Sequence, residues 1–337
     1  MCDKIYTMRY MGSKIKLLDF VIPIIESLCN DGDTIIDLMA GTHSVGYALK
    51  PNHRIICNDI QEYSRNIGVA LIENNGVSLT KDEALQVYNS VEKDSKYNLF
   101  EKFYSDTYFS KEQCVDIDKI RHAADLQENE IRKALILTGL MYAMGYCQSS
   151  AGHFAQYMPK DNPRIQNLRK LSIKDSFVSW FSNAKVSNTP YENVVLAEDY
   201  SDLLSEDVAK EAKVVYLDPP YSEAQYSRFY HLLETMVKYD FPALKYKGLY
   251  REDRFQSNFC YKNRVGDEFE KVARLCKENG SSLVISYSDK GLIGIDKLTK
   301  ILKCHYDSVD IHSKAYKHSM QGRGMTDSLH EIVISCH

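Results

Sequence analysis

The chain has 337 residues, of which 44% are hydrophobic and 26% charged, and its formal net charge is −4. These values are typical of a folded globular protein, and the length allows one large domain, alone or with an insertion. The acidic balance excludes a uniformly basic surface, so any nucleic-acid-binding surface must be a local patch.

The cysteine and histidine patterns predict neither a metal site nor a disulfide framework. The nine cysteines are scattered singly, and none of the ten histidines belongs to a His-Glu-x-x-His pattern. We therefore predict no metal and a reducing, cytoplasmic location. The start of the chain lacks the layout of a signal peptide. The longest apolar stretch, 134–146, is too short to cross a bilayer, so we predict a buried helix there and no membrane association.

Hydrophobic periodicity predicts alternating strands and helices in both outer parts of the chain and helices alone in the middle. The predicted strands are 34–38, 54–58, 194–197, 214–217, 282–287, about 305–312 and 329–335. The predicted helices are 17–28, 80–95, 110–124, 128–146, 164–182, 231–238, 267–278 and 290–302. This pattern predicts an α/β fold whose helical segment, 76–189, is a domain of its own inserted between 1–75 and 190–337.

Gly12 and Ser13 form a tight entry to the first predicted helix. Ser13 is a candidate N-cap residue. Lys14 falls in the first helical turn, where a cation opposes the helix dipole. Either an anionic partner such as a carboxylate or simple exposure to solvent explains a lysine at this position.

A glycine-bracketed turn follows the first predicted strand. Asp37 ends the strand, and Gly41 and Thr42 belong to a loop in which the backbone can approach a ligand closely. The spacing is that of Gly-x-Gly-x-x-Gly, except that His43 occupies the middle position. Dinucleotide sites, S-adenosylmethionine sites and purely structural turns all use such loops.

Acidic residues also follow the next two predicted strands. Asp59 is placed to accept hydrogen bonds from ribose hydroxyls, and it can also cap the helix that begins near Gln61. Asp199 and Tyr200 follow the third strand, where a side-chain acceptor and an aromatic ring are suited to hold an adenine ring.

The segment Asp218, Pro219, Pro220 and Tyr221 follows an apolar strand directly, at the edge where open α/β sheets bind ligands. An exocyclic amine of adenine is a weak nucleophile. Hydrogen bonds from this amine to the Asp218 carboxylate and the Pro219 carbonyl would localise its lone pair and aim it at a methyl donor. The two prolines offer only carbonyls, and Tyr221 offers a face for an extruded base. Taken alone, the same four residues also fit a plain strand-ending turn.

Three segments carry basic residues that suit contact with nucleic acid. In the predicted helix 164–182 these are Arg164, Arg169 and Lys170, which fit a phosphate backbone or an ordinary surface helix. The segment 245–264 mixes aromatic residues with basic ones that include Arg251, Arg254 and Lys262, which suits displaced bases or a loop with buried anchors. The segment 314–324 contains Lys317 and Arg323, and we predict a hairpin loop that enters a DNA groove.

Taken in order, the motifs at 9–14, 37–46, 59, 198–200 and 218–221 resemble the Dam/FokI-like α-group of adenine-specific DNA methyltransferases. The resemblance covers nearly the whole chain except the helical insertion. It implies a Rossmann-like, S-adenosylmethionine-dependent catalytic fold, double-stranded DNA as substrate, and target recognition by the inserted helical domain. It also implies a restriction-modification system with a possible cognate restriction endonuclease.

The resemblance also implies roles for single residues. Tyr10 and Lys14 match the family's cofactor-contacting aromatic residue and lysine, Asp59 matches its ribose-binding acid, and Asp218 matches its contact to both cofactor and target amine. His43 departs from the family pattern, which usually has glycine there, and the departure bears on cofactor affinity. Histidine adopts left-handed backbone conformations more readily than most residues.

Two other functions remain open from the residues alone. The first is methylation of another planar amine, in RNA or in a protein glutamine, since related Pro-Pro-Tyr turns serve those substrates. The second is a DNA-binding module whose cofactor site has decayed at His43. Transfer of a labelled methyl group distinguishes the first, and equilibrium binding of S-adenosylmethionine distinguishes the second.

Overall fold

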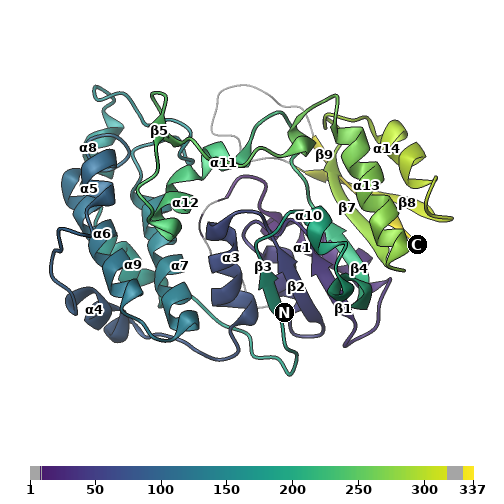
Figure 1. Cartoon of the computed structure of the whole chain (residues 1–337), viewed down its shortest axis with the longest axis horizontal. Coiled ribbons are helices and arrows are strands. Elements are labelled where there is room, and N and C mark those ends of the chain that lie inside the picture. Colours follow the sequence, from purple (N-terminus) through teal and green to yellow (C-terminus); the bar gives the residue numbers. More distant parts are fainter. Residues whose placement is uncertain (1–7, 9, 317–328) are drawn as a thin grey trace.

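The computed structural model describes residues 8, 10–316 and 329–337, which form a central seven-stranded sheet flanked by helices (Figure 1). The strand order is β3-β2-β1-β4-β7-β9-β8. Strands β3, β2, β1, β4 and β7 are parallel, whereas β9 runs antiparallel to both of its neighbours. The strands are β1 (Thr34–Asp37), β2 (Arg54–Asn58), β3 (Val194–Leu196), β4 (Ala212–Leu217), β7 (Ser282–Ser288), β8 (Val309–Tyr316) and β9 (Leu329–Cys336). This confirms the predicted Rossmann-like α/β fold.

Helices cover both faces of the sheet because alternate strand residues point to opposite sides. Ile35 and Val214 belong to the buried cluster on one face, and Ile36 and Val215 belong to the cluster on the other. The first face carries α1 (Leu18–Glu26), α2 (Ser44–Leu49) and α3 (Glu62–Gly68). The second face carries α10 (Tyr200–Leu203), α13 (Val265–Glu278) and α14 (Ile295–Leu302).

The chain between α3 and β3 forms six α-helices, which gather on one side of the sheet, beyond α3 (Figure 1). They are α4 (Lys81–Asn89), α5 (Leu99–Tyr104), α6 (Lys111–Asp125), α7 (Glu130–Cys147), α8 (Arg164–Leu168) and α9 (Ile173–Trp180). Most of the apolar stretch of α7 is buried, as predicted. One continuous buried cluster joins these helices to the sheet, so the division into two domains stays a prediction. Within the described ranges, no helix is long and apolar enough to cross a membrane.

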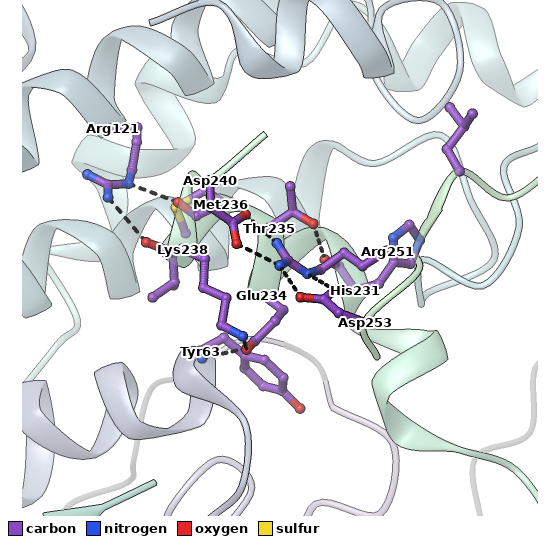
Figure 2. A network of polar contacts seen from close by, with 12 residues as sticks. Tyr63, Arg121, His231, Glu234, Thr235, Met236, Lys238, Asp240, Arg251 and Asp253 are labelled. Atoms are coloured by element: carbon purple, nitrogen blue, oxygen red, sulfur yellow. Dashed lines mark hydrogen bonds and ion pairs between the residues drawn. The ribbon is translucent and has the colours of Figure 1, made fainter. Parts of the chain in front are cut away.

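Helix α12 (His231–Lys238) contacts both α3 and α6 through residues shown in Figure 2. The Arg121 guanidinium on α6 donates to the carbonyls of Met236 and Val237, at 2.9 and 3.2 Å. The carboxylate of Glu234 accepts the Tyr63 N–H of α3 at 3.1 Å. The remaining elements nearby are α11 (Tyr226–Phe229) and a hairpin of β5 (Leu244–Lys245) and β6 (Tyr250–Arg251). Helix α12 therefore connects α3, which packs on the sheet, to α6 of the helical segment.

The predicted cap of the first helix is wrong. A 3₁₀ turn over Lys14–Lys16 precedes α1, and Ser13 makes no side-chain cap hydrogen bond. The Ser13 hydroxyl is buried and has no hydrogen-bond partner among the described residues. The tight turn at Gly12, whose φ is 81°, instead turns Lys14 into the interior.

Candidate active site

Four acidic residues gather at the carboxyl ends of four adjacent parallel strands. Asp37 ends β1, Asp59 follows β2, Asp199 comes shortly after β3, and Asp218 follows β4. The direction of strand succession reverses between β1 and β4, which opens a crevice at this edge of the sheet. All four residues line one cavity of about 1170 Å³. The strand ends therefore bring together residues that lie far apart in the sequence.

Lys14 lies at the centre of a buried polar cluster in this cavity. Its ammonium donates to Asp218 Oδ1 at 2.8 Å and to the Tyr221 hydroxyl at 2.6 Å, and it lies 3.3 Å from Glu331 Oε1. The Tyr221 hydroxyl lies 2.6 Å from Asp218 Oδ1 and 3.0 Å from Glu331 Oε1. Of the two explanations left open for Lys14, the structure supports the anionic partner, since the residue is only 4% exposed.

The cluster members stabilise one another's protonation states. Burial favours the neutral form of Lys14, but the carboxylates of Asp218 and Glu331 outweigh it and raise the pKa of the ammonium. Burial raises the pKa of Glu331, and Lys14 partly opposes that shift. Burial, followed by the two nearby carboxylates, raises the pKa of Tyr221 well above its ordinary value. Lys14 is therefore charged and Tyr221 protonated at neutral pH.

Asp37 and Asp59 bind the backbone of the glycine-bracketed turn. Asp37 Oδ2 accepts the Gly46 N–H at 3.1 Å, and Asp59 Oδ2 accepts the Gly41 N–H at 3.0 Å. Asp59 Oδ1 also accepts the Gln61 N–H at 3.0 Å. Burial raises the pKa of Asp37 to about 7 and that of Asp59 to about 6, against these hydrogen bonds. Both carboxylates are consequently close to their titration range near neutral pH.

Tyr10 packs against the same turn, in the cavity lining together with Thr42. Its ring stacks on Tyr230 with centroids 4.4 Å apart, and its hydroxyl lies 3.1 Å from that of Tyr63. A Cβ on Gly41, whose φ is 55°, would lie 3.2 Å from the Tyr10 ring. Glycine at position 41 therefore permits both the backbone conformation and the close contact.

The other predicted residues lie on the same lining. Asp199 caps α10 by accepting hydrogen bonds from the N–H and hydroxyl of Ser201, and the Tyr200 hydroxyl bonds to Glu268. Asp199, Tyr200, Pro219 and Pro220 all line the cavity. The Lys14 ammonium lies 4.9 Å from the centre of the Tyr221 ring.

His43 adopts the left-handed conformation that a glycine would favour, with φ 59° and ψ 26°. Its side chain is fully buried and points toward α3, where Nε2 lies 2.8 Å from the Ser64 carbonyl. A Cβ on Gly68 would lie 2.6 Å from His43 Cε1, so glycine in α3 makes room for the ring. Burial lowers the pKa of His43 to about 4. The imidazole is thus neutral and lies outside the cavity lining.

We expect His43→Gly to change S-adenosylmethionine affinity less than threefold, because the imidazole does not occupy the cavity. The free energy of unfolding should fall by about 1–2 kcal/mol, since the lost packing outweighs the relieved backbone strain. Calorimetric titration and urea unfolding measure these two effects. A gain of more than tenfold in affinity would instead show that the histidine obstructs the cofactor.

The residues predicted to contact DNA fall into different environments. Arg164 is exposed and lines the cavity, and Lys170 and Lys262 are exposed. Arg169 is half-buried, with Nη1 3.4 Å from Asp106, and Arg254 lies over the Tyr250 ring. Lys317 and Arg323 lie outside the described residues. DNA contact by the residues of this group therefore stays a prediction.

The prediction for Arg251 is wrong, because this residue is buried and already paired (Figure 2). Its guanidinium binds both carboxylate oxygens of Asp240, at 2.6 and 2.7 Å. It also binds Asp253, at 3.0 and 2.8 Å. A guanidinium with its donors occupied by two carboxylates is unavailable to phosphate. The basic character of the segment therefore partly reflects a structural ion pair.

Arg164→Gln and Arg251→Gln are matched changes with different expected results. Arg164→Gln should weaken duplex DNA binding about equally for all sequences and reduce the salt slope by about one, if Arg164 contacts phosphate. Arg251→Gln should leave these values unchanged and lower the free energy of unfolding by about 1–3 kcal/mol. DNA titrations at several salt concentrations and urea unfolding measure both. The reverse outcome would contradict the assignment of Arg251 as structural.

Several site residues were not predicted from the sequence, namely Glu331, Tyr63, Tyr226 and Tyr230. Glu331 carries one available signal, since it is the only acidic residue of the predicted strand 329–335. The tyrosines carry no such signal, because this chain has 24 of them.

The lining fits S-adenosylmethionine, which is cationic at sulfur and carries a ribose and an adenine ring. Seven carboxylates line the cavity around the buried Lys14, namely Asp37, Asp59, Glu198, Asp199, Asp218, Glu268 and Glu331. The hydroxyl of Ser13 and Glu198 Oε2 are buried without partners in the described ranges, so both are available to a ligand. Of the residues that the structure describes, no group of three or more His, Cys, Asp or Glu could hold a metal ion.

A doubly wound sheet with an acidic crevice at its switch point defines a Rossmann-like α/β protein with a ligand site at the strand ends. The sequence model of the D12 class N6 adenine-specific DNA methyltransferase family matches residues 10–320, and the chain belongs to this family.

Comparison with individual proteins also finds enzymes named as methyltransferases or modification methylases. The chain is 28% identical to Type II methyltransferase M.FokI of Planomicrobium okeanokoites, over 97% of this chain and 52% of that protein. It is 28% identical to modification methylase LlaI of Lactococcus lactis subsp. lactis, over 97% and 54%. It is 26% identical to Type II methyltransferase M.NlaIII of Neisseria lactamica, over 92% of each. The chain thus spans about half the length of the first two relatives.

Among solved structures, the rRNA methyltransferase aviRa of Streptomyces viridochromogenes aligns with a TM-score of 0.32 and 9% identity, over 97% of this chain and 86% of that one. A likeness this low carries no argument, so the fold assignment rests on the strand order of this chain.

Proposed function

We propose that the protein transfers a methyl group from S-adenosylmethionine to the exocyclic amine of an adenine in duplex DNA. We further propose that it is the modification enzyme of a restriction-modification system with a cognate endonuclease. The family match and the names of the relatives, Type II methyltransferase and modification methylase, support this. The observation that carries the proposal is the Lys14–Asp218 pair within one acidic cavity at the strand ends.

Asp218 and Pro219 orient the target amine in this proposal. A hydrogen bond to the Asp218 carboxylate and another to the Pro219 carbonyl hold the amine with its lone pair directed into the cavity. The ring of Tyr221 stacks on the extruded base. The Leu292 N–H, 3.2 Å from the Tyr221 carbonyl, fixes the backbone of this turn.

The remaining lining residues hold the methyl donor. When bound, S-adenosylmethionine supplies an electrophilic methyl group on a sulfonium. Asp59 accepts from the ribose hydroxyls, and Asp199 with Tyr200 holds the adenine ring. Tyr10, Lys14, Asp37, Gly41 and Thr42 complete the site, with Asp218 in contact with both donor and target amine. Fixed carboxylates around a cation favour its binding without reorganisation of the site.

The helical segment 76–189 recognises the target sequence in this proposal. The exposed Arg164 and Lys170 lie on α8 or just beyond it, and Arg164 reaches the cavity lining. A phosphate contact there would place the DNA duplex over the mouth of the cavity.

Methyl transfer from labelled S-adenosylmethionine tests the proposal. We expect label in duplex DNA, recovered as N6-methyladenine, and none in RNA or protein extract. Label in RNA or glutamine would replace the proposed substrate. An absence of S-adenosylmethionine binding at millimolar concentration would instead support a DNA-binding module without a cofactor.

We expect S-adenosylmethionine affinity to decrease as the pH falls below about 6, because the pKa of Asp59 is raised to about 6 by burial. Ionised Asp59 accepts ribose hydroxyls, whereas its protonated form must donate, so the decrease approaches about tenfold per pH unit. Calorimetric titrations from pH 5 to 8 measure it. In Asp59→Asn the affinity at pH 8 should be lower and this pH dependence smaller. A constant wild-type affinity over this range would contradict a role for ionised Asp59.

A further inference from the structure

The buried carboxylate of Glu331 is a member of the site cluster to which the proposed function gives no role. It lies on β9, which inserts beside β7 and places Glu331 opposite Ser288 at the carboxyl end of that strand. The residue is 5% exposed and contacts both Lys14 and Tyr221. A buried charge is costly unless its partners stabilise it.

The Tyr221 hydroxyl has one proton and two carboxylates within reach. Asp218 Oδ1 lies at 2.6 Å and Glu331 Oε1 at 3.0 Å. Because its oxygen also lies 2.6 Å from the Lys14 ammonium, which has no acceptor capacity, that contact must be donated by Lys14. The hydroxyl proton therefore points at Asp218 or at Glu331, but not at both.

The direction of this proton changes the strength of Asp218 as an acceptor. Asp218 Oδ1 already receives the Lys14 ammonium at 2.8 Å. A second donor, the Tyr221 hydroxyl, withdraws further charge from the carboxylate, so its free oxygen binds an amine less strongly. Glu331 competes for both donors, since it lies 3.3 Å from the Lys14 ammonium and within reach of the hydroxyl.

We propose that Glu331 is a positioning residue. When the target amine binds, Glu331 accepts the hydrogen bond from the Tyr221 hydroxyl and shares the Lys14 ammonium, which leaves Asp218 free to orient that amine. The inference rests on the proposed function, because it assigns the amine to Asp218. Glu331 itself does not contact the base or the methyl donor in this scheme.

Protonation of Glu331 should remove this competition. Burial raises the pKa of Glu331, so the change falls closer to neutral pH than for an ordinary glutamate. The titratable and charged side chains that face Glu331 are Lys14, Asp218 and Tyr221 in the cluster, Tyr216 on β4, Tyr226 on α11, and Lys314, its register partner on β8. Once Glu331 is neutral, the hydroxyl turns to Asp218 and the rate falls on the acid side.

Glu331→Gln, Tyr221→Phe and the double variant test the inference, with Glu278→Gln at the exposed end of α13 as the matched control. Single-turnover transfer to duplex DNA is measured at saturating donor from pH 5 to 9. S-adenosylmethionine and DNA dissociation constants are measured by titration without turnover. We expect Glu331→Gln to lower the rate about tenfold and to change both constants less than threefold.

The double variant separates this role from a purely structural one. Tyr221→Phe keeps the stacking ring but removes the competing proton, so it should restore much of the rate lost in Glu331→Gln. Tyr221→Phe alone should also flatten the acid limb of the rate profile, a result that does not depend on the folding of Glu331→Gln. A double variant as slow as Glu331→Gln, or an unchanged acid limb, would overturn the inference. If the wild-type protein transfers no methyl to DNA, the proposed function fails instead.

Discussion

Replacement of Asp218 by alanine is expected to abolish methyl transfer while the protein still folds and binds DNA. Asp218 lies at the end of β4, where its carboxylate contacts Lys14 and Tyr221 and its side chain is 20% exposed in the cavity. In the proposed mechanism, loss of this carboxylate removes the main acceptor for the target amine, and we expect the rate to fall by about 10³-fold or more. Glu331 remains to pair with Lys14, so the buried ammonium keeps an anionic partner.

Incorporation of labelled methyl into duplex DNA measures this loss, and DNA binding and thermal unfolding show whether the variant is otherwise intact. Asp207→Ala is a suitable control, because Asp207 is an exposed carboxylate paired with Lys210 on the surface. The control should transfer methyl at the wild-type rate. Retained transfer in Asp218→Ala would remove this residue from the chemistry.

Lys14→Met is expected to lower the free energy of unfolding by about 3 kcal/mol at pH 8, because it leaves two carboxylates without their shared cation. The effect should depend on pH. Burial already raises the pKa of Glu331 and Lys14 partly opposes that shift, so without the ammonium this pKa rises further and the folded state binds more protons than the unfolded chain. Stability is then lost as the pH rises, and Lys14→Met should be closest to wild type near pH 5.

Urea unfolding of both proteins at pH 5 and pH 8 measures this dependence. Lys16→Met is the control for stability, since Lys16 belongs to the same 3₁₀ turn but is exposed. It should change the free energy of unfolding by less than about 0.5 kcal/mol at either pH. A Lys14→Met deficit that is equal at both pH values would contradict the proposed coupling to the two carboxylates.

The sequence alone was sufficient to predict the sheet and the acidic edge of the site. Apolar runs ending in Asp37, Asp59 and Asp218 mark strands whose carboxyl ends carry polar groups. Parallel strands of one sheet present these ends at a common edge, so the acids had to lie close together. The choice between a solvated Lys14 and a paired one was open in the sequence, because local spacing contains no information on a partner more than 200 positions away.

Only the tertiary structure decided which other residues join or leave the site. Glu331 belongs to the site because β9 lies between β7 and β8 and runs antiparallel to both, an order that strand periodicity does not specify. Arg251 is excluded from DNA contact because it forms ion pairs with Asp240 and Asp253, although its segment has the basic and aromatic composition of a nucleic-acid-binding segment. His43 keeps the backbone of a glycine while its ring packs away from the cavity, against Gly68. Sequence patterns report periodicity and local conformation, whereas burial and pairing depend on which distant segments meet.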